Sequence, residues 1–426
     1  MRADLAARLG QIRWNLHPLW GLAPRVDHKN DGLVESNLLS LSYGQVVRKD
    51  INEIGGLRPD SYETYNIIAP GDTVLRMTDL QNDQRSIRTG LATERGIITS
   101  AYITVRPDGD KVEPRFLHSV LRAYDIKKTF YEMGVGVRQT LKYAELADLP
   151  IPLPPRDTQR AIADYLDRET GEIDAMRAKL NELESTLLKR RRSVILEATC
   201  QGGPEEGRSA RPSSFEVSKH EWQIVPLKFA VDSAQTGVWG QEANGGSDDV
   251  PCVRVADFDR LRIRVTEAPT IRRIKYKDRV RCELQKGDLL VEKSGGSGKN
   301  PVGAVAAYVG DFPAVCSNFI LRLRCRENHY PRFWLYVLHG SYIAGRTWNY
   351  VRQTTGIQNL DVNGFMSMSH PAPDFDEQRR IADHLDEATS RIDAMLAKID
   401  ELKALLVERR ASLITDVVTG RKKIPS

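Results

Sequence analysis

Arginine and lysine side chains are concentrated in one segment of the second half of the chain. Between positions 260 and 281, nine Lys or Arg residues stand against two acidic ones. Arg260, Arg262 and Arg264 alternate with apolar residues, which predicts a strand with three guanidinium groups on one face. Such a face suits neutralisation of phosphates and contacts to base edges of a nucleic acid. The alternative for any single basic run is an ordinary solvated strand face.

A glycine-rich loop follows this basic segment. Residues 294–300 read SGGSGKN, but Lys293 stands where a phosphate-binding P-loop has its first glycine, and Asn300 replaces the hydroxyl residue that would hold magnesium. We interpret the segment as a polar loop that approaches a DNA backbone through its amides. The corresponding place in the first half, residues 76–81, has no glycine and includes Asp79. If these loops read bases, the two halves read different ones.

The candidate DNA contacts are charged or polar side chains in both halves of the chain. They are Arg76, Asp79, Arg85, Arg88, Arg138 and Gln139 in the first half, and Arg254, Arg262, Arg264, Lys293, Ser294, Lys299, Arg346, Arg352 and Gln353 in the second. We expect Arg262 and Arg264 to bind phosphates, and the loop residues Lys293, Lys299, Arg352 and Gln353 to reach a groove.

Motifs of catalysis and of metal binding are missing from the sequence. There is no G-x-S-x-G, H-E-x-x-H, Walker A or dinucleotide fingerprint, and no N-P-P-Y-type motif of amino-group methyltransferases. The five cysteines include no C-x-x-C pair and have no histidine at ligand spacing. We therefore expect no catalytic centre, no metal site and no cofactor bound by this chain.

The elements that must position the candidate residues come in two copies. Residues 159–196 and 378–415 are near-copies of each other, identical at more than half of their positions without a gap. Pro152 and Pro154 have counterparts in Pro371 and Pro373, and a W-x-[LI]-x-P-L pattern opens each half at positions 14 and 222. The chain is therefore a tandem duplication, whose intervening segments agree only in scattered places.

Both near-copies have the heptad pattern of long helices that pair with each other. The expected pairing residues are Leu166, Ile173, Leu180 and Leu187 in the first copy, and Leu385, Ile392, Ile399 and Leu406 in the second. Ile162, Met176 and Leu183, with Ile381, Met395 and Leu402, occupy an adjacent seam. Asp157 and Asp376 are candidate N-caps. The alternative is that each helix packs only on its own domain.

These patterns predict an α+β chain in which a long antiparallel two-helix coiled coil separates two mixed α/β domains, with an internal pseudo-twofold repeat. The expected parts are a first domain (1–155), a spacer helix (156–200), a linker (201–219), a second domain (220–373), a second spacer helix (374–420) and a tail (421–426). Residues 97–105 and 319–323 are expected as strands, and residues 116–124 and 333–338 as the starts of helices.

Composition adds only weak limits on function. The 426 residues carry a net charge of +5, which permits a nucleic-acid partner without requiring one. No apolar run approaches the roughly 20 residues of a membrane span, and the N-terminus is charged where a signal peptide would be apolar. We expect a soluble, cytoplasmic protein that has no membrane partner.

The repeated motifs support a more specific prediction. On P-x-P followed by Q-R-x-I-A-D-x-L-D and I-D-A-M in both copies, together with the two W-x-[LI]-x-P-L segments, the chain resembles the specificity subunit of type I restriction-modification enzymes. The resemblance covers nearly the whole chain. It implies that residues 1–155 and 220–373 are target recognition domains for the two halves of a split, asymmetric DNA site, and that the helices set the gap between them.

The resemblance also implies partners that carry out the catalysis. These are two S-adenosylmethionine-dependent DNA adenine methyltransferase subunits and, for cleavage, ATP/Mg-dependent motor-nuclease (restriction) subunits. Two identical partners would bind a surface that is repeated twice, and Asp174, Asp393, Arg191 and Arg410 are candidate contacts on it. The competing predictions are a stand-alone DNA-binding regulator or coiled-coil adaptor, and a fused enzyme with its own methyltransferase.

Overall fold

The chain folds into two compact units. The computed structural model describes residues 3–50, 61–80, 83, 87–133, 140–199, 222–298, 300–354 and 356–425. Unit 1 contains residues 1–181 and 400–426, and unit 2 contains residues 182–399. The expected linker, residues 201–219, lies outside the described residues.

Unit 1 combines short strands with a few helices before the first long helix. Its strands are β1 (Leu16–Pro18), β2 (Leu39–Ser42), β3 (Gln45–Arg48), β4 (Asn66–Ile68), β5 (Thr73–Leu75), β6 (Thr89–Leu91), β7 (Gly96–Ile98), β8 (Ile103–Val105) and β9 (Pro150–Pro152). Its helices are α1 (Ala3–Ala7), α2 (Pro114–Ile126), α3 (Thr129–Met133), α4 (Tyr143–Leu146) and the start of α5 (Arg156–Thr199).

The core of unit 1 forms around α2. This helix begins with Pro114, whose fixed φ suits a first turn, and it buries Phe116, Val120 and Tyr124 along one face. The three-stranded sheet β6-β5-β8 contributes buried residues to the same cluster. The single strand expected over residues 97–105 is wrong. The segment forms two strands, β7 and β8, because a turn between residues 99 and 102 reverses the chain.

Unit 2 has a larger sheet. Its strands are β10 (Gln223–Pro226), β11 (Val231–Thr236), β12 (Gln241–Glu242), β13 (Asp249–Val253), β14 (Arg264–Val265), β15 (Ile271–Arg273), β16 (Leu289–Glu292), β17 (Ser294–Gly295), β18 (Val305–Tyr308), β19 (Val315–Cys316), β20 (Ile320–Cys325), β21 (Val351–Thr354), β22 (Ile357–Leu360) and β23 (Ser369–Ala372). Its helices are α6 (Leu227–Ala230), α7 (Tyr276–Cys282), α8 (Pro331–Ile343), α9 (Val362–Ser367) and the start of α10 (Phe375–Val418).

The five-stranded sheet β11-β20-β16-β18-β14 is the centre of unit 2. Strands β16 and β18 are buried along their whole lengths, as their near-continuous apolar sequences require. Helix α8 covers this sheet with Phe333, Trp334 and Val337, all buried. The strand expected over residues 319–323 and the helices expected from 116 and 333 are confirmed as β20, α2 and α8.

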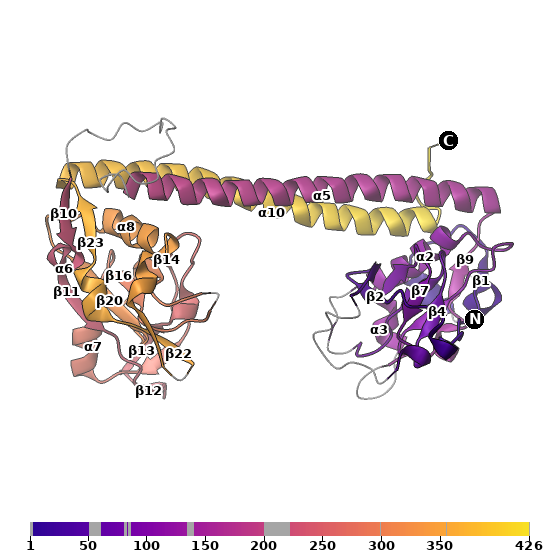
Figure 1. Cartoon of the computed structure of the whole chain (residues 1–426), viewed down its shortest axis with the longest axis horizontal. Coiled ribbons are helices and arrows are strands. Elements are labelled where there is room, and N and C mark those ends of the chain that lie inside the picture. The colour runs from indigo at the N-terminus through magenta and orange to yellow at the C-terminus, as the bar shows by residue number, and fades with distance from the viewer. Residues whose placement is uncertain are drawn as a thin grey trace. The chain divides into compact units, whose positions relative to one another are not determined.

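The entry and exit segments of each unit pair with each other. Strand β1 pairs antiparallel with β9, and β10 pairs antiparallel with β23, which lies beside it in unit 2 (Figure 1). In each unit, the W-x-[LI]-x-P-L segment and the proline segment of the repeat therefore form the two strands of one antiparallel pair, which we call the closure of that unit. The second strand of each closure leads directly into the long helix.

Two glutamines of the repeat hold the helix starts in the same way. The Gln159 amide donates to the carbonyl of Pro154 at 2.8 Å, and its Oε1 accepts from the backbone N–H of Glu113, which precedes α2. Gln378 repeats both contacts with Pro373 and with Tyr330, which precedes α8. Each buried amide thus ties a long helix to the start of a domain helix.

An ion pair also recurs at one position of both sheets. Asp72, just before β5, accepts two hydrogen bonds from Arg106 at 2.8 and 2.7 Å. Asp288, just before β16, accepts two from Arg324 at the same two distances. The sheets of the two units therefore share a frame in which β5 corresponds to β16.

The long helices α5 and α10 occupy the predicted ranges, with 44 residues each. The N-cap prediction is wrong for both, because Asp157 and Asp376 lie inside the first turns. In α10 the cap is Asp374, whose carboxylate accepts from the backbone N–H of Glu377 at 2.9 Å. Of the helices in the described part of the chain, none combines the length and apolarity that a membrane span requires.

Candidate nucleic-acid interface

The basic segment of unit 2 is a turn and not the predicted strand. Only Arg264 belongs to β14, because the preceding residues form a turn in which Ile263 has a φ of 49°. Arg262 pairs with Asp259 at 3.2 Å, and Arg260 pairs with the buried Glu292 at 2.8 Å. The three guanidinium groups therefore do not share one strand face.

A pocket of about 290 Å³ gathers four arginines of unit 2. Arg262 and Arg264 line it together with Arg191 of α5 and Arg332 of α8. Asp393 and Asp386 hold Arg191 and Arg332 in ion pairs, whereas Arg264 is exposed and has no ion pair within the described residues. A pocket in which carboxylates fix some arginines and one arginine has no ion pair is suited to bind a phosphate oxygen.

The glycine-rich loop extends from a small three-stranded sheet, β17-β22-β21. Ser294 donates from its hydroxyl to Asn359 of β22 at 2.7 Å, and Lys293 is half-buried. On β21, Arg352 and Gln353 are exposed, and the Arg352 guanidinium pairs with Asp361 at 2.5 Å. Lys299 lies outside the described residues. Ser294 and Arg352 lie on the two outer strands of this sheet, and both are in register with Asn359 of the central strand β22.

Two further candidates in unit 2 are held by local contacts. Arg254 pairs with Asp257 at 3.0 Å and lines a pocket of about 370 Å³ with Trp239 and Phe319. Arg346 is exposed and donates to the carbonyl of Ser369. Both remain candidates for contact with DNA.

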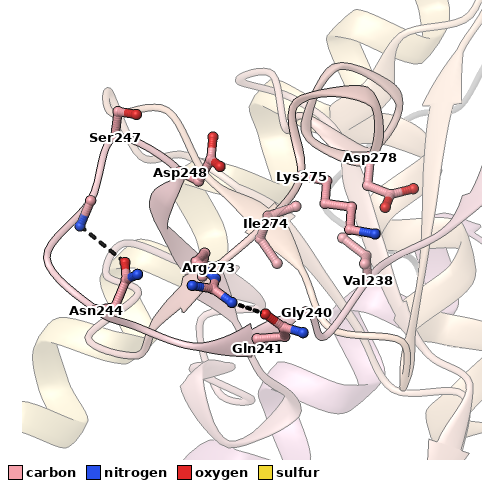
Figure 2. Close-up of a pocket in the computed structure, with 11 residues that line it drawn as sticks. Val238, Gly240, Gln241, Asn244, Ser247, Asp248, Arg273, Ile274, Lys275 and Asp278 are labelled. Carbon is pink, nitrogen blue, oxygen red and sulfur yellow. Dashed lines mark hydrogen bonds between the residues drawn. The ribbon is translucent and has the colours of Figure 1, made fainter.

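A third surface pocket, of about 460 Å³, lies at the β12, β13 and β15 sheet (Figure 2). Arg273 of β15 contacts the side-chain oxygen of Gln241, and Lys275 and Asp278 line the same pocket. The walls therefore carry both signs of charge. Such a lining favours a polar ligand but does not select an anion or a cation.

Arg88 of unit 1 is not a DNA contact in this fold. It is fully buried, and its guanidinium donates to the carbonyls of Thr78, Asp79 and Asp83. The side chain therefore holds the loop that follows β5, and its donors face the interior. The prediction failed because the carbonyls that bind Arg88 come from residues with no charge pattern in the sequence.

The other candidates of unit 1 divide into two groups. Arg76 directly follows β5, Asp79 lies three residues further along, and both are partly exposed; Asp79 has a φ of 56°. Arg85, Arg138 and Gln139 lie outside the described residues.

The helix-pairing residues lie mostly inside their units. Leu166, Ile173, Leu385, Ile392, Ile399 and Leu406 are buried, and Leu180 and Leu187 are half-buried. In the adjacent seam only Ile162 and Ile381 are buried. Met176, Leu183, Met395 and Leu402 remain 48 to 52% exposed, so that part of the prediction is wrong.

The repeated charged positions are used inside each unit. Arg191 pairs with Asp393 in unit 2, and Arg410 pairs with Asp174 in unit 1. These four residues are the predicted contacts for partner proteins. Each charge is matched by a neighbour on the other long helix, and contact with a partner stays a prediction.

Comparison with known proteins relates the chain to one group. A family model described as the type I restriction modification DNA specificity domain matches residues 66–185. The chain is 21% identical over 383 residues to the type I restriction enzyme EcoBI specificity subunit of Escherichia coli, covering 86% of this chain and 76% of that protein. It is 26% identical over 320 residues to the StySPI specificity subunit of Salmonella potsdam, covering 72% and 66%.

Two solved structures share the fold. One belongs to work on complex assembly and conformational transition of the type I R-M system, with a TM-score of 0.68, 17% identity, and coverage of 95% of this chain and 97% of that chain. The other is the crystal structure of the HsdS subunit from Thermoanaerobacter tengcongensis, with a TM-score of 0.51, 17% identity, and coverage of 96% and 97%.

Proposed function

Because the chain belongs to the specificity subunits of type I restriction-modification systems, we propose that it selects a bipartite, asymmetric DNA site, one half with each unit. The main support for this proposal is that the same backbone arrangement occurs in both units. The closures β1/β9 and β10/β23 and the ion pairs Asp72–Arg106 and Asp288–Arg324 recur, while the surface loops differ. One frame with two different loop sets suits two modules that read different sequences.

The two long helices act as an antiparallel spacer between the recognition domains. The ion pairs of α5 and α10 support this orientation. Asp174 lies 17 residues before Arg191 on α5, whereas its partner Arg410 lies 17 residues after Asp393 on α10. Along the helix pair, residue numbers therefore increase on α5 where they decrease on α10, as they do in an antiparallel pair. A spacer of this kind fixes the gap between two half-sites on one face of the DNA.

The methyl transfer and the cleavage belong to partner subunits. Exposed apolar side chains recur at matched positions of the repeat, namely Met176 with Met395, Leu183 with Leu402, and Leu188 with Val407. A repeated apolar surface suits two copies of one partner, here a DNA adenine methyltransferase that uses S-adenosylmethionine. The restriction subunits, which use ATP and Mg, join this assembly.

Co-purification with the methyltransferase, followed by mass measurement and a methylation assay, tests the proposal. We expect two methyltransferase subunits per chain, methylation of a split site by the complex, and no methyl transfer by the chain alone. Replacing Leu183 and Leu402 together by serine should reduce the number of bound methyltransferases. The matched control is the double variant Ser185→Ala and Ala404→Ser, which should leave the number of bound methyltransferases unchanged. One methyltransferase per active complex would contradict the proposal.

A further inference from the structure

Arg76, the residue after strand β5 in unit 1, occupies the same place as Glu292, the last residue of β16 in unit 2. Arg76 and Glu292 each lie four positions after the aspartate of the recurring ion pair. The backbone N–H of Arg76 donates to the carbonyl of Arg88 at 2.8 Å, and that of Glu292 donates to Ala304 at the same distance. Arg88 and Ala304 are the matching residues beside β6 and β18, each 12 positions further along the chain.

The loops that follow these two residues also match. The carbonyl of the next residue accepts a backbone hydrogen bond in both units, Met77 from Leu141 and Lys293 from Leu360. Three positions after Arg76 and Glu292, Asp79 and Gly295 have positive φ values of 56° and 117°. Positions 76 and 292 are therefore one structural position, filled by side chains of opposite charge.

The Arg76 and Glu292 side chains differ in their exposure and in the hydrogen bonds that they already make. Arg76 is partly exposed, and its guanidinium makes no hydrogen bond or ion pair within the described residues. Glu292 is 3% exposed, and its Oε2 accepts from Arg260 at 2.8 Å. No described residue hydrogen-bonds to its Oε1. One acceptor of a buried carboxylate thus remains unused.

The free oxygen of Glu292 lies at a pocket that is open to solvent on one side. Glu292, Gly295, Trp239 and Phe319 line this pocket of about 370 Å³. Because position 295 has no side chain, the approach to Oε1 is clear, and a Cβ there would lie 3.7 Å from it. The Arg272 guanidinium lies 4.5 Å from the Trp239 ring centre and holds that aromatic wall in place.

We infer that the side chain at the matched positions 76 and 292 sets which base edge each unit accepts, an inference that rests on the proposed function. The Glu292 pocket takes a base with an exocyclic amino group, the N4 of cytosine or the N6 of adenine, which donates to Oε1. Arg76 donates to the acceptor edge of guanine, its O6 and N7. These are the pairings that the chemistry of carboxylate and guanidinium groups allows. The aromatic walls of the pocket cover the apolar part of the base.

Glu292→Gln reverses the polarity of the pocket without changing its shape. Arg260 donates toward position 292, so the amide must turn its oxygen to Arg260 and its NH₂ group into the pocket. The variant should then lose about tenfold in discrimination at one base pair of one half-site. Its preference should move from a base with an amino group to one with a carbonyl acceptor. Asp311→Asn, which removes an equal charge from an exposed pair with Lys286, is the control.

The experiment uses the complex with its methyltransferase subunits. The methylated site of the wild type is read by sequencing, and binding is then measured on duplexes with each single base-pair change in that site. A change of preference at one base pair supports the inference. An unchanged profile, or an equal loss on all duplexes, overturns it. A wild-type complex with no sequence preference would instead refute the proposed function.

Arg76→Met provides a second test if Glu292→Gln fails to fold. The Arg76 side chain has no partner among the described residues, so its replacement should leave folding unchanged, as thermal unfolding of the full chain would verify. We expect about a tenfold loss of discrimination at one guanine of the other half-site. A uniform loss on cognate and scrambled DNA would identify Arg76 as a phosphate contact and overturn its assignment.

Discussion

Burial and the groups that bind a charged side chain decide whether it is a candidate for contact with DNA. Arg88 and Arg264 each follow an isoleucine in the sequence, but Arg88 is fully buried against backbone carbonyls and Arg264 is exposed in a pocket. Their roles depend on contacts that are distant in sequence. Composition alone could not separate a loop-holding arginine from a candidate phosphate ligand.

His370 of β23 should make unit 2 less stable in acid. It is fully buried beside Trp334, and neither ring nitrogen has a hydrogen-bond partner among the described residues. Burial, aided by the charge of Arg346, lowers the pKa of His370 from 6.5 to about 3. Between these pH values the unfolded chain binds one more proton than the folded chain. The free energy of unfolding therefore falls by about 1.4 kcal/mol for each pH unit below 6.5.

Replacement of His370 by leucine should remove this contribution. The pH dependence of the free energy of unfolding, measured by urea unfolding of the full chain between pH 7.5 and 5, should become shallower than in the wild type. No hydrogen bond is lost, because the ring nitrogens have none. His17→Leu is the control, since the His17 side chain is exposed in the folded chain. An equal slope for wild type and His370→Leu would refute the prediction.

At the scale of elements, the sequence predicted those helices and strands that local periodicity alone defines. The heptad spacing placed α5 and α10 correctly, because a helix needs only its own residues to define its buried face. The strand predicted at Arg260 to Arg264 failed, because Asp259 and Glu292 bind the first two arginines and bend the chain. Glu292 itself was missed. A single acidic residue at the end of an apolar strand is not a recognisable motif. Only the structural match between β5 and β16 shows that Glu292 corresponds to Arg76.

The two ion pairs between the long helices should differ in strength although they join the same repeat positions. The side chains of Arg191 and Asp393 are 6 and 13% exposed, whereas those of Arg410 and Asp174 are 35 and 44% exposed. Arg191→Met leaves a buried carboxylate unpaired and should cost about 3–5 kcal/mol in free energy of unfolding. Arg410→Met should cost only about 0–1 kcal/mol.

Urea unfolding of both variants at low and high salt measures this difference. The Arg410 pair should weaken further with salt, and the Arg191 pair should not, because water and ions reach only the exposed pair. Equal costs for the two variants would show that burial does not control these pairs.

At the scale of the whole molecule, the duplication makes the globular part of each unit a separable insert. The main cores of unit 1 and unit 2 are distinct clusters, each including residues from both long helices. The closing strands β1 and β9, like β10 and β23, bracket each insert with a backbone pairing that depends little on side chains. A domain can therefore be exchanged at these strands while the helices and their contacts stay in place.

Exchange of residues 19–149, between β1 and β9, for those of a related specificity subunit should change one half of the methylated site. The other half and the gap between them should be preserved, because unit 2 and the long helices are untouched. The reciprocal exchange of residues 227–368, between β10 and β23, should change only the other half. Sequencing of methylated DNA from cells that express each chimera with its methyltransferase measures both outcomes. If either exchange altered both halves, the bases would be read jointly and the two domains would not be independent readers.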